Sequence, residues 1–249
     1  MNVPIAMFHQ VEDAKPEDLK DWSINHQKFS AFLDQVEQSG LQTTTFEEIF
    51  LQSLSATQLR EKVIITFDDC AAGLMRFAVP ELIRRNMKAV FYIPTAHINR
   101  YNQWDVEEQG FDQISLMDET NLLFLRDQGM EIGSHGHRHL RHNLVDESIV
   151  YEEFSKSKDI LEKLLEKQVY SLAHPYGEVS KRYRLLMEHA GYHYGVGIYS
   201  AFENQFCLRR FGIHQSDSPK SIRFKLGRRY RLFRSVLDPI LEFKRRLKA

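Results

Sequence analysis

Cysteine is scarce in this sequence of 249 residues, which contains only Cys70 and Cys207. Two cysteines make no disulfide framework, and these two lack the paired spacing of a zinc–thiolate site. The count therefore excludes a metal centre built on thiolates. It also favours a reducing compartment as the environment of the protein.

Long apolar runs are missing as well. The mean hydropathy of -0.43 excludes a bundle of membrane helices. Residues Met1–His9 have no basic region, and their apolar stretch is too short for a signal peptide or a spanning helix. We therefore expect a cytoplasmic protein that is not exported by this route. Internal repeats and low-complexity stretches are not evident, and the length suits one large domain.

Charge is unevenly distributed, although the formal net charge is only -1. Residues 220–249 contain eleven Lys and Arg against Asp238 and Glu242, so this segment carries +9 and the remainder carries -10. We expect a main domain over residues 1–217 and a basic amphipathic extension over residues 218–249. A nucleic-acid partner is not expected, because the extension has no base-stacking platform and the negative remainder would repel a polyanion.

The basic extension also shows helical spacing of apolar residues. The apolar members are Phe233, Val236, Leu237, Ile240, Leu241 and Leu247, and the basic residues around them are Arg231, Arg234, Lys244, Arg245, Arg246 and Lys248. Such a helix can lie at an anionic membrane, which predicts peripheral contact with the inner membrane face. The alternative is that the apolar stripe packs on the main domain or on a second subunit. Pro239 predicts a kink or a new helix start.

Short β-branched or aromatic runs alternate with segments of helical periodicity, which is typical of strand-helix units around a parallel sheet. The expected strands are 3–8, 63–67, 89–93, 130–134, 169–174, 194–199 and 206–213, and the expected helices are 28–38, 74–85, 118–127, 146–166 and 180–189. About seven strands indicate a barrel or an open doubly wound sheet. In either fold, functional residues gather just past the carboxyl ends of the strands.

Two adjacent carboxylates, Asp68 and Asp69, directly follow the expected strand 63–67. Neighbouring residues in an extended chain point in different directions, so one carboxylate can bind a metal while the other faces a water molecule. Taken alone, an Asp-Asp pair is more often a surface turn.

A histidine cluster follows the expected strand 130–134. His135 and His139 are four residues apart, so on one helical turn they would share a face and could bind one cation. His137 lies between them and should point away. Two imidazoles and one carboxylate leave coordination positions open for water and substrate, as catalytic metal sites do. The alternative is a solvated basic loop.

These motifs resemble those of the polysaccharide deacetylase family, also called the NodB-homology domain or carbohydrate esterase family four. The family's Thr-Phe-Asp-Asp-Gly is matched by Thr66-Phe67-Asp68-Asp69-Cys70, and its His-Ser/Thr-x-x-His by the run from His135 to His139. A third segment, Ala173-His174-Pro175-Tyr176-Gly177, resembles the Ala-Tyr-Pro-Tyr-Gly that lines the family's substrate groove. The similarity extends from about residue 5 to residue 213. It implies a deformed TIM-like (β/α) barrel.

The resemblance also implies roles for particular residues. Asp69, His135 and His139 would hold one divalent metal ion, zinc first, although Fe, Co, Ni or Mn would also suit these ligands. Asp68 would be the catalytic base. The substrate groove would be lined by His174, Pro175, Tyr176 and Gly177.

Two further roles follow from the same likeness. Phe8-His9-Gln10-Val11 resembles a motif in which the histidine is the general acid, and His214 is a second candidate for that role. Arg210 sits where related sequences place an arginine, and beside Asp68 it would hold that carboxylate ionised and oriented.

The expected activity is removal of N-acetyl groups from an amino-sugar glycan, or from a cytoplasmic glycan precursor of surface polysaccharide. Residues 1–217 would be the catalytic domain. The alternative is a non-catalytic glycan-binding protein on the same fold. It is motivated by Cys70 and Gly136, which stand where the family has Gly and Ser or Thr.

Overall fold

The computed structural model describes residues 1, 3–13, 17–198 and 203–246, with residues 17 and 241–246 described by backbone alone. The end of the expected strand 194–199, and Leu247 and Lys248 of the expected basic helix, lie outside these residues. Within the described chain, no helix is both long enough and apolar enough to cross a bilayer.

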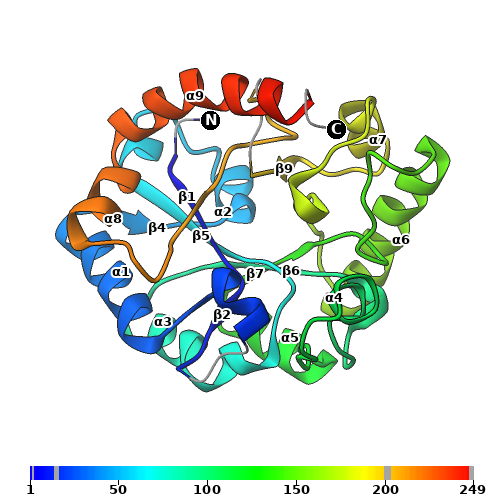
Figure 1. Ribbon diagram of the computed structural model, residues 1–249, viewed down its shortest axis with the longest axis horizontal. Coiled ribbons are helices and arrows are strands. Elements are labelled where there is room, and N and C mark those ends of the chain that lie inside the picture. The colour runs from blue at the N-terminus through cyan, green and yellow to red at the C-terminus, as the bar shows by residue number, and fades with distance from the viewer. Residues whose placement is uncertain (2, 14–16, 199–202, 247–249) are drawn as a thin grey trace.

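A curled parallel sheet forms the centre of the molecule (Figure 1). Its strands run in the order β10-β1-β5-β6-β7-β8-β9, with β4 paired to β5 beside this path. The strands are β1 Ile5–Phe8, β4 Gln42–Thr43, β5 Lys62–Phe67, β6 Val90–Ile93, β7 Glu131–Ser134, β8 Ser171–Ala173, β9 Tyr194–Val196 and β10 Phe211–Gly212. The sheet is a half-barrel, so the expected (β/α) barrel fold is confirmed. A separate two-stranded sheet pairs β2 Gln10–Val11 with β3 Ser23–Ile24.

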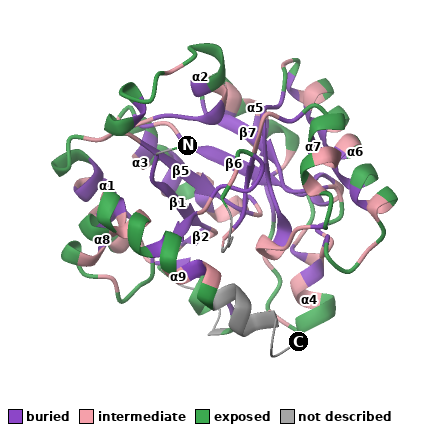
Figure 2. Cartoon of the chain, turned by 90° about the horizontal axis from the view of Figure 1, so that it is seen from above, coloured by how far each residue is buried: buried purple, intermediate pink, exposed green. Residues whose placement is uncertain are grey.

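Helices surround the sheet (Figure 1) and leave their outer faces exposed (Figure 2). The α-helices are α1 His26–Gln38, α2 Phe46–Leu51, α3 Ala78–Arg84, α4 Gln103–Gln109, α5 Glu119–Asp127, α6 Glu147–Leu165, α7 Tyr183–His189, α8 Pro219–Leu226 and α9 Arg228–Arg246. The 3-10 turns are Glu17–Trp22, Gln58–Glu61, Ala72–Arg76, Thr95–His97 and Pro175–Gly177. Four of the α-helices, α1, α5, α6 and α7, lie close to the expected ranges, whereas the sequence pattern did not predict α2 or α4.

Two expected elements differ from those observed. The helix expected over residues 74–85 is a 3-10 turn followed by α3, which places Pro80 in the first turn, where its missing N–H costs no hydrogen bond. The strand expected over residues 206–213 is reduced to β10. Before it, Cys207 donates its N–H to the carbonyl of Asn204, which makes a turn.

The barrel core is rich in stacked aromatic rings, because strands covered on both faces can be apolar at every position. The rings of Phe67 and Phe91, on neighbouring strands, lie 4.9 Å apart and nearly parallel, and Phe8 packs against Phe67 at 5.5 Å. These packed rings hold the strand ends from which the residues after β1, β5 and β7 extend.

The segment 208–212 joins the two edges of the sheet. Leu208 pairs with Val196 of β9, and three residues later Phe211 pairs with Ala6 of β1. Arg210 lies between these two pairings. Its side chain therefore enters the barrel at the seam, where it can reach the end of β5.

The C-terminal residues form two helices on the body. Helix α8 buries Ile222 and Leu226 in the main core. Helix α9 continues through Pro239 as one helix, so no new helix begins at that residue.

Candidate active site

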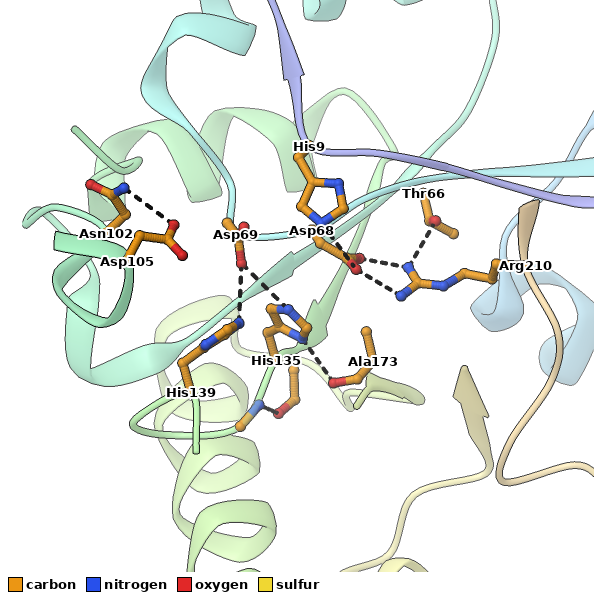
Figure 3. Close-up of polar contacts among 12 residues, drawn as sticks. His9, Thr66, Asp68, Asp69, Asn102, Asp105, His135, His139, Ala173 and Arg210 are labelled. Atoms are coloured by element: carbon orange, nitrogen blue, oxygen red, sulfur yellow. Dashed lines mark hydrogen bonds and ion pairs between the residues drawn. The ribbon is translucent and has the colours of Figure 1, made fainter. Parts of the chain in front are cut away.

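The predicted metal ligands come from the carboxyl ends of β5 and β7, which are separated in the sheet by β6 (Figure 3). Asp68 and Asp69 follow β5, and His135 follows β7, while His139 comes from the loop after it. The chain turns sharply at Asp69 and Cys70, whose φ angles of 65° and 57° are left-handed. The sequence argument assumed an extended chain here, but it is this turn that directs Asp68 to Arg210 and Asp69 to the two histidines.

Asp69, His135 and His139 converge on one point. One ligand atom from each lies within 4.8 Å of the others. The Nε2 atoms of both histidines are 3.4 Å from Oδ1 of Asp69, and this oxygen is buried without a hydrogen-bond partner among the described residues. Two ligands at about 2.0–2.1 Å from a tetrahedral zinc ion lie roughly 3.3 Å apart, so this spacing fits a shared divalent cation.

The surroundings fix the imidazoles in a metal-binding orientation. The Nδ1 atom of His135 donates to the carbonyl of Ala173 at 2.8 Å, which leaves Nε2 free to act as a ligand. The indole of Trp104 stacks on His139 with ring centroids 4.1 Å apart.

Electrostatics in the site favour ionised carboxylates. Burial opposes ionisation of Asp69, but the imidazoles of His135 and His139, whose Nε2 atoms lie beside its carboxylate, hold its pKa well below the ordinary value. Burial lowers the pKa of His139 to about 4, so this ring is neutral at pH 7. Burial also opposes protonation of His135, but the charge of Asp68 raises its pKa. An anionic carboxylate beside a neutral imidazole is the donor set that a divalent cation needs.

Asp68 is held by Arg210 in a fully buried ion pair. Two guanidinium nitrogens, Nη1 and Nη2, donate to the two carboxylate oxygens at 2.6 and 2.7 Å. Arg210 is itself anchored by Thr66 Oγ1 and by the carbonyl of Gly197. Although burial opposes ionisation of Asp68, the charge of Arg210 keeps the pKa of this carboxyl below its usual value. The structure thus places Arg210 where the resemblance put it.

His9 lies on the other side of Asp68, and its Nε2 is 4.0 Å from Oδ2 of that carboxylate. Its ring packs against Trp22 with centroids 4.8 Å apart. Burial lowers the pKa of His9. His214, the other candidate acid, is exposed and does not line the cavity that contains the metal-ligand set.

The site opens into a cavity of about 390 Å³. Besides the predicted residues, it is lined by nine that sequence reasoning did not assign to the site: Gln10, Leu19, Trp22, Trp104, Asp105, Gln109, Arg141, Glu178 and Ile198. Burial, together with the nearby charge of Asp69, raises the pKa of Asp105 to about 7. Three of the nine, Trp104, Asp105 and Gln109, belong to α4, whose polar sequence gives no helical periodicity.

A family model for polysaccharide deacetylases matches residues 55–195, which is more than half of the chain and includes both metal-ligand motifs. The chain belongs to the polysaccharide deacetylase family. Its expected family is confirmed, and with it the class of carbohydrate deacetylase.

Individual relatives of this deacetylase are distant. It is 24% identical over 213 residues to the Bacillus subtilis protein YxkH, described as a polysaccharide deacetylase, with 84% of this chain and 70% of that protein covered. Among solved structures, the Streptococcus pyogenes deacetylase PplD matches with a TM-score of 0.76 and 22% identity, over 91% of this chain and 99% of the other. IcaB from Ammonifex degensii matches with a TM-score of 0.71 and 16% identity, over 90% and 97%. These two likenesses show the fold.

Three of the four predicted groove residues do not line the cavity of this deacetylase. His174 is fully buried, donates its ring hydrogen to the carbonyl of Phe206, and packs edge-on against Phe154. It points into the core because it continues β8, and burial lowers its pKa to about 4. Pro175 and Gly177 do not line the cavity either, whereas Tyr176 does.

The two departures from the family motifs are accommodated outside the cavity. Cys70 is buried in the main hydrophobic cluster. Gly136 has a φ of 76°, and its N–H donates to Oγ of Ser134. The next two backbone N–H groups, of His137 and Arg138, both donate to the buried carboxylate of Glu153. Ser134 and Glu153 thus hold the loop that carries His135 and His139, and His137 turns away to Thr95.

Proposed function

We propose that this chain is a metal-dependent N-deacetylase that acts on amino-sugar glycans or their precursors in surface-polysaccharide biosynthesis. The observation that carries the proposal is the convergence of Asp69, His135 and His139 directly beside the Asp68–Arg210 pair. A ligand set without a base would suit binding alone. A base held ionised next to a metal site suits hydrolysis.

A divalent cation on the three ligands would supply Lewis acidity, polarising the acyl oxygen and lowering the pKa of water. Zinc is the first choice, and Fe, Co, Ni or Mn suit the same ligands. The rest of the chemistry belongs to the side chains and backbone. Asp68, oriented by Arg210, accepts a proton from the attacking water. His9 gives a proton to the departing amine nitrogen, and a backbone N–H near Tyr176 holds the oxygen that gains negative charge.

The cavity supports an amino-sugar substrate. Its volume of about 390 Å³ is in the range of small-ligand sites, and its lining mixes aromatic rings with polar groups. The indole of Trp22 is 45% exposed beside His9 and offers a flat apolar surface to a sugar ring. Glu178 and Arg141, which line the same cavity, supply hydrogen-bonding groups for sugar hydroxyls.

The test is acetate release from short N-acetylglucosamine oligomers. The purified chain is stripped with a chelator and reloaded separately with zinc, cobalt, nickel, manganese or ferrous iron. We expect no acetate from the stripped protein and one acetate per new free amine from a reloaded one. Glycan binding without acetate release from any metal form would favour the non-catalytic alternative.

The general acid is assigned by a matched pair of variants. His9→Ala should lower kcat/KM by about 10²-fold or more, because the amine then leaves without a proton donor. His214→Ala should keep activity close to that of the parent, since this side chain lies outside the cavity. The reverse result would move the role of acid to His214.

A further inference from the structure

Helix α9 presents an apolar face that points away from the body. Four of its side chains, Leu232, Phe233, Val236 and Ile240, are between 49% and 69% exposed. They recur at the spacing that places residues on one face of a helix. Figure 1 shows α9 along one edge of the molecule, and no described element covers its outer side.

The opposite face of α9 is fixed to the body by buried polar contacts. Asp238 is completely buried between Arg234, one turn earlier in the helix, and Arg209 of the seam. Arg234 also donates to the carbonyl of Ile198. These contacts determine the rotation of the helix, so its apolar stripe cannot turn toward the core. Of the apolar residues expected in this stripe, Phe233, Val236 and Ile240 are therefore exposed and not packed on the main domain.

The exposed charges of α8 and of the described side chains of α9 have one sign. Lys220, Arg223, Arg228 and Arg229 are exposed on α8 and at the start of α9. Asp238 is the acidic residue of the described side chains in 219–240, and it is buried in its ion pairs. Every exposed charge of this stretch is thus positive. Arg229 lies three residues before Leu232, on the same face as the apolar side chains.

We infer that this outer face of α9 is a docking surface for an anionic phospholipid bilayer. Apolar side chains at the centre would enter the boundary between headgroups and acyl chains, and the flanking arginines would meet lipid phosphates. A second copy of the chain fits less well. A two-fold interface sets a patch against itself, so positive charge would face positive charge. The inference goes beyond the proposed reaction and does not depend on it.

The experiment measures co-sedimentation of the full chain with vesicles of phosphatidylcholine alone or with added phosphatidylglycerol. We expect binding to the anionic vesicles at low ionic strength, and much weaker binding to neutral vesicles or at high ionic strength. Truncation before α8 is unsuitable, because Ile222 and Leu226 belong to the core. Single exposed substitutions are therefore used.

Two matched pairs of variants locate the surface. Leu232→Gln should weaken vesicle binding roughly tenfold, because burying one leucine side chain in the bilayer strengthens binding by about that factor. Leu51→Gln, at a similarly exposed leucine on α2, should not change it. Arg229→Gln should weaken binding about fivefold. Arg60→Gln, an exposed arginine on a distant 3-10 turn, should leave it unchanged.

Three results would overturn the inference. The first is equal binding to neutral and anionic vesicles, and the second is equal effects of the two leucine variants. The third is a stable dimer that fails to bind vesicles and that Leu232→Gln dissociates, because the face would then belong to a second copy.

Discussion

Strand β7 has a buried titratable residue at each end, and the two residues differ in the groups that they contact. Glu131 begins the strand and is 1% exposed, and His135 follows its last residue and is 2% exposed. Glu131 accepts hydrogen bonds from Oγ of Ser171 and from the backbone N–H of Glu47. His135 instead faces the carboxylate of Asp69.

The difference lies in the kind of partner. Burial raises the pKa of Glu131 to about 7, and its neutral donors only partly offset this effect. At the other end, ionic partners keep Asp68 and Asp69 charged in spite of burial. A perturbed pKa by itself therefore does not mark the functional end of the strand. What marks it is a set of charged groups and free ligand atoms facing a cavity.

The largest effect should follow from removing a metal ligand at the functional end. Asp69→Ala, His135→Ala and His139→Ala should each lose stoichiometric metal, because three protein ligands are the minimum set for such a site. Several kcal/mol of transition-state stabilisation would be lost, so kcat/KM should fall by about 10³-fold or more. Metal content per chain and acetate release are measured together. Any variant that keeps both shows that its residue is not a ligand.

Asp68→Asn should show that the catalytic base and the metal ligand at this end of the strand are different residues. The amide keeps the shape of the side chain but cannot accept the proton, so activity should fall by about 10²- to 10⁴-fold with metal still bound. Arg210 would lose its ionic partner, and some loss of stability is also expected. Metal loss as severe as that in Asp69→Ala would contradict the division of roles between the two carboxylates.

The end of the strand with the metal ligands could be predicted from sequence, because its residues lie in short continuous motifs. Asp68 and Asp69 adjoin an apolar strand run, and His135 and His139 sit four apart after another, so two short motifs give the ligand set. The parallel sheet then brings both strand ends together. The family resemblance added Arg210, which lies far from Asp68 in sequence.

The cavity wall was less predictable, because it depends on how segments without motifs pack. Helix α4 carries Trp104 and Asp105, yet its sequence has too few apolar residues to show a period of 3.6. His174 was assigned to the groove by likeness, but direction along a strand is set by register, and it faces the core. Tyr176 reaches the cavity only because its own φ of 59° reverses the chain.

Substitution at the beginning of β7 should change stability and its pH dependence, with catalysis preserved. The folded pKa of Glu131, about 7, is above its ordinary value of 4.5, so the folded state binds the extra proton between these values. Stability should therefore fall as pH rises from 4.5 to 7 and then level off, by at most about 3 kcal/mol. Glu131→Gln should remove this dependence, which denaturant unfolding at pH 5 and pH 8 would measure.

Loss of acetate release in a Glu131→Gln protein that still folds would show that the two ends of the strand are coupled. Glu131 would then have a role in catalysis as well as in stability. A pH profile of stability identical to that of the parent would show instead that Glu131 is already ionised in the folded protein, well below pH 7.

The smallest effect is expected at Cys70, the family's glycine position in the turn after Asp69. A left-handed φ of 57° costs a side chain about 1–2 kcal/mol, which Cys70→Gly would relieve. The substitution also removes a buried side chain and adds backbone freedom to the unfolded chain, at a cost of similar size. Stability should therefore change by less than about 1 kcal/mol.

Metal content and kcat/KM of Cys70→Gly should match the parent, because Cys70 packs in the core and does not line the cavity. Since burial raises the pKa of this thiol, it should also resist alkylation in the folded parent. A large rise in activity on Cys70→Gly would show that the thiol restricts the substrate, and that this turn belongs to the pocket after all.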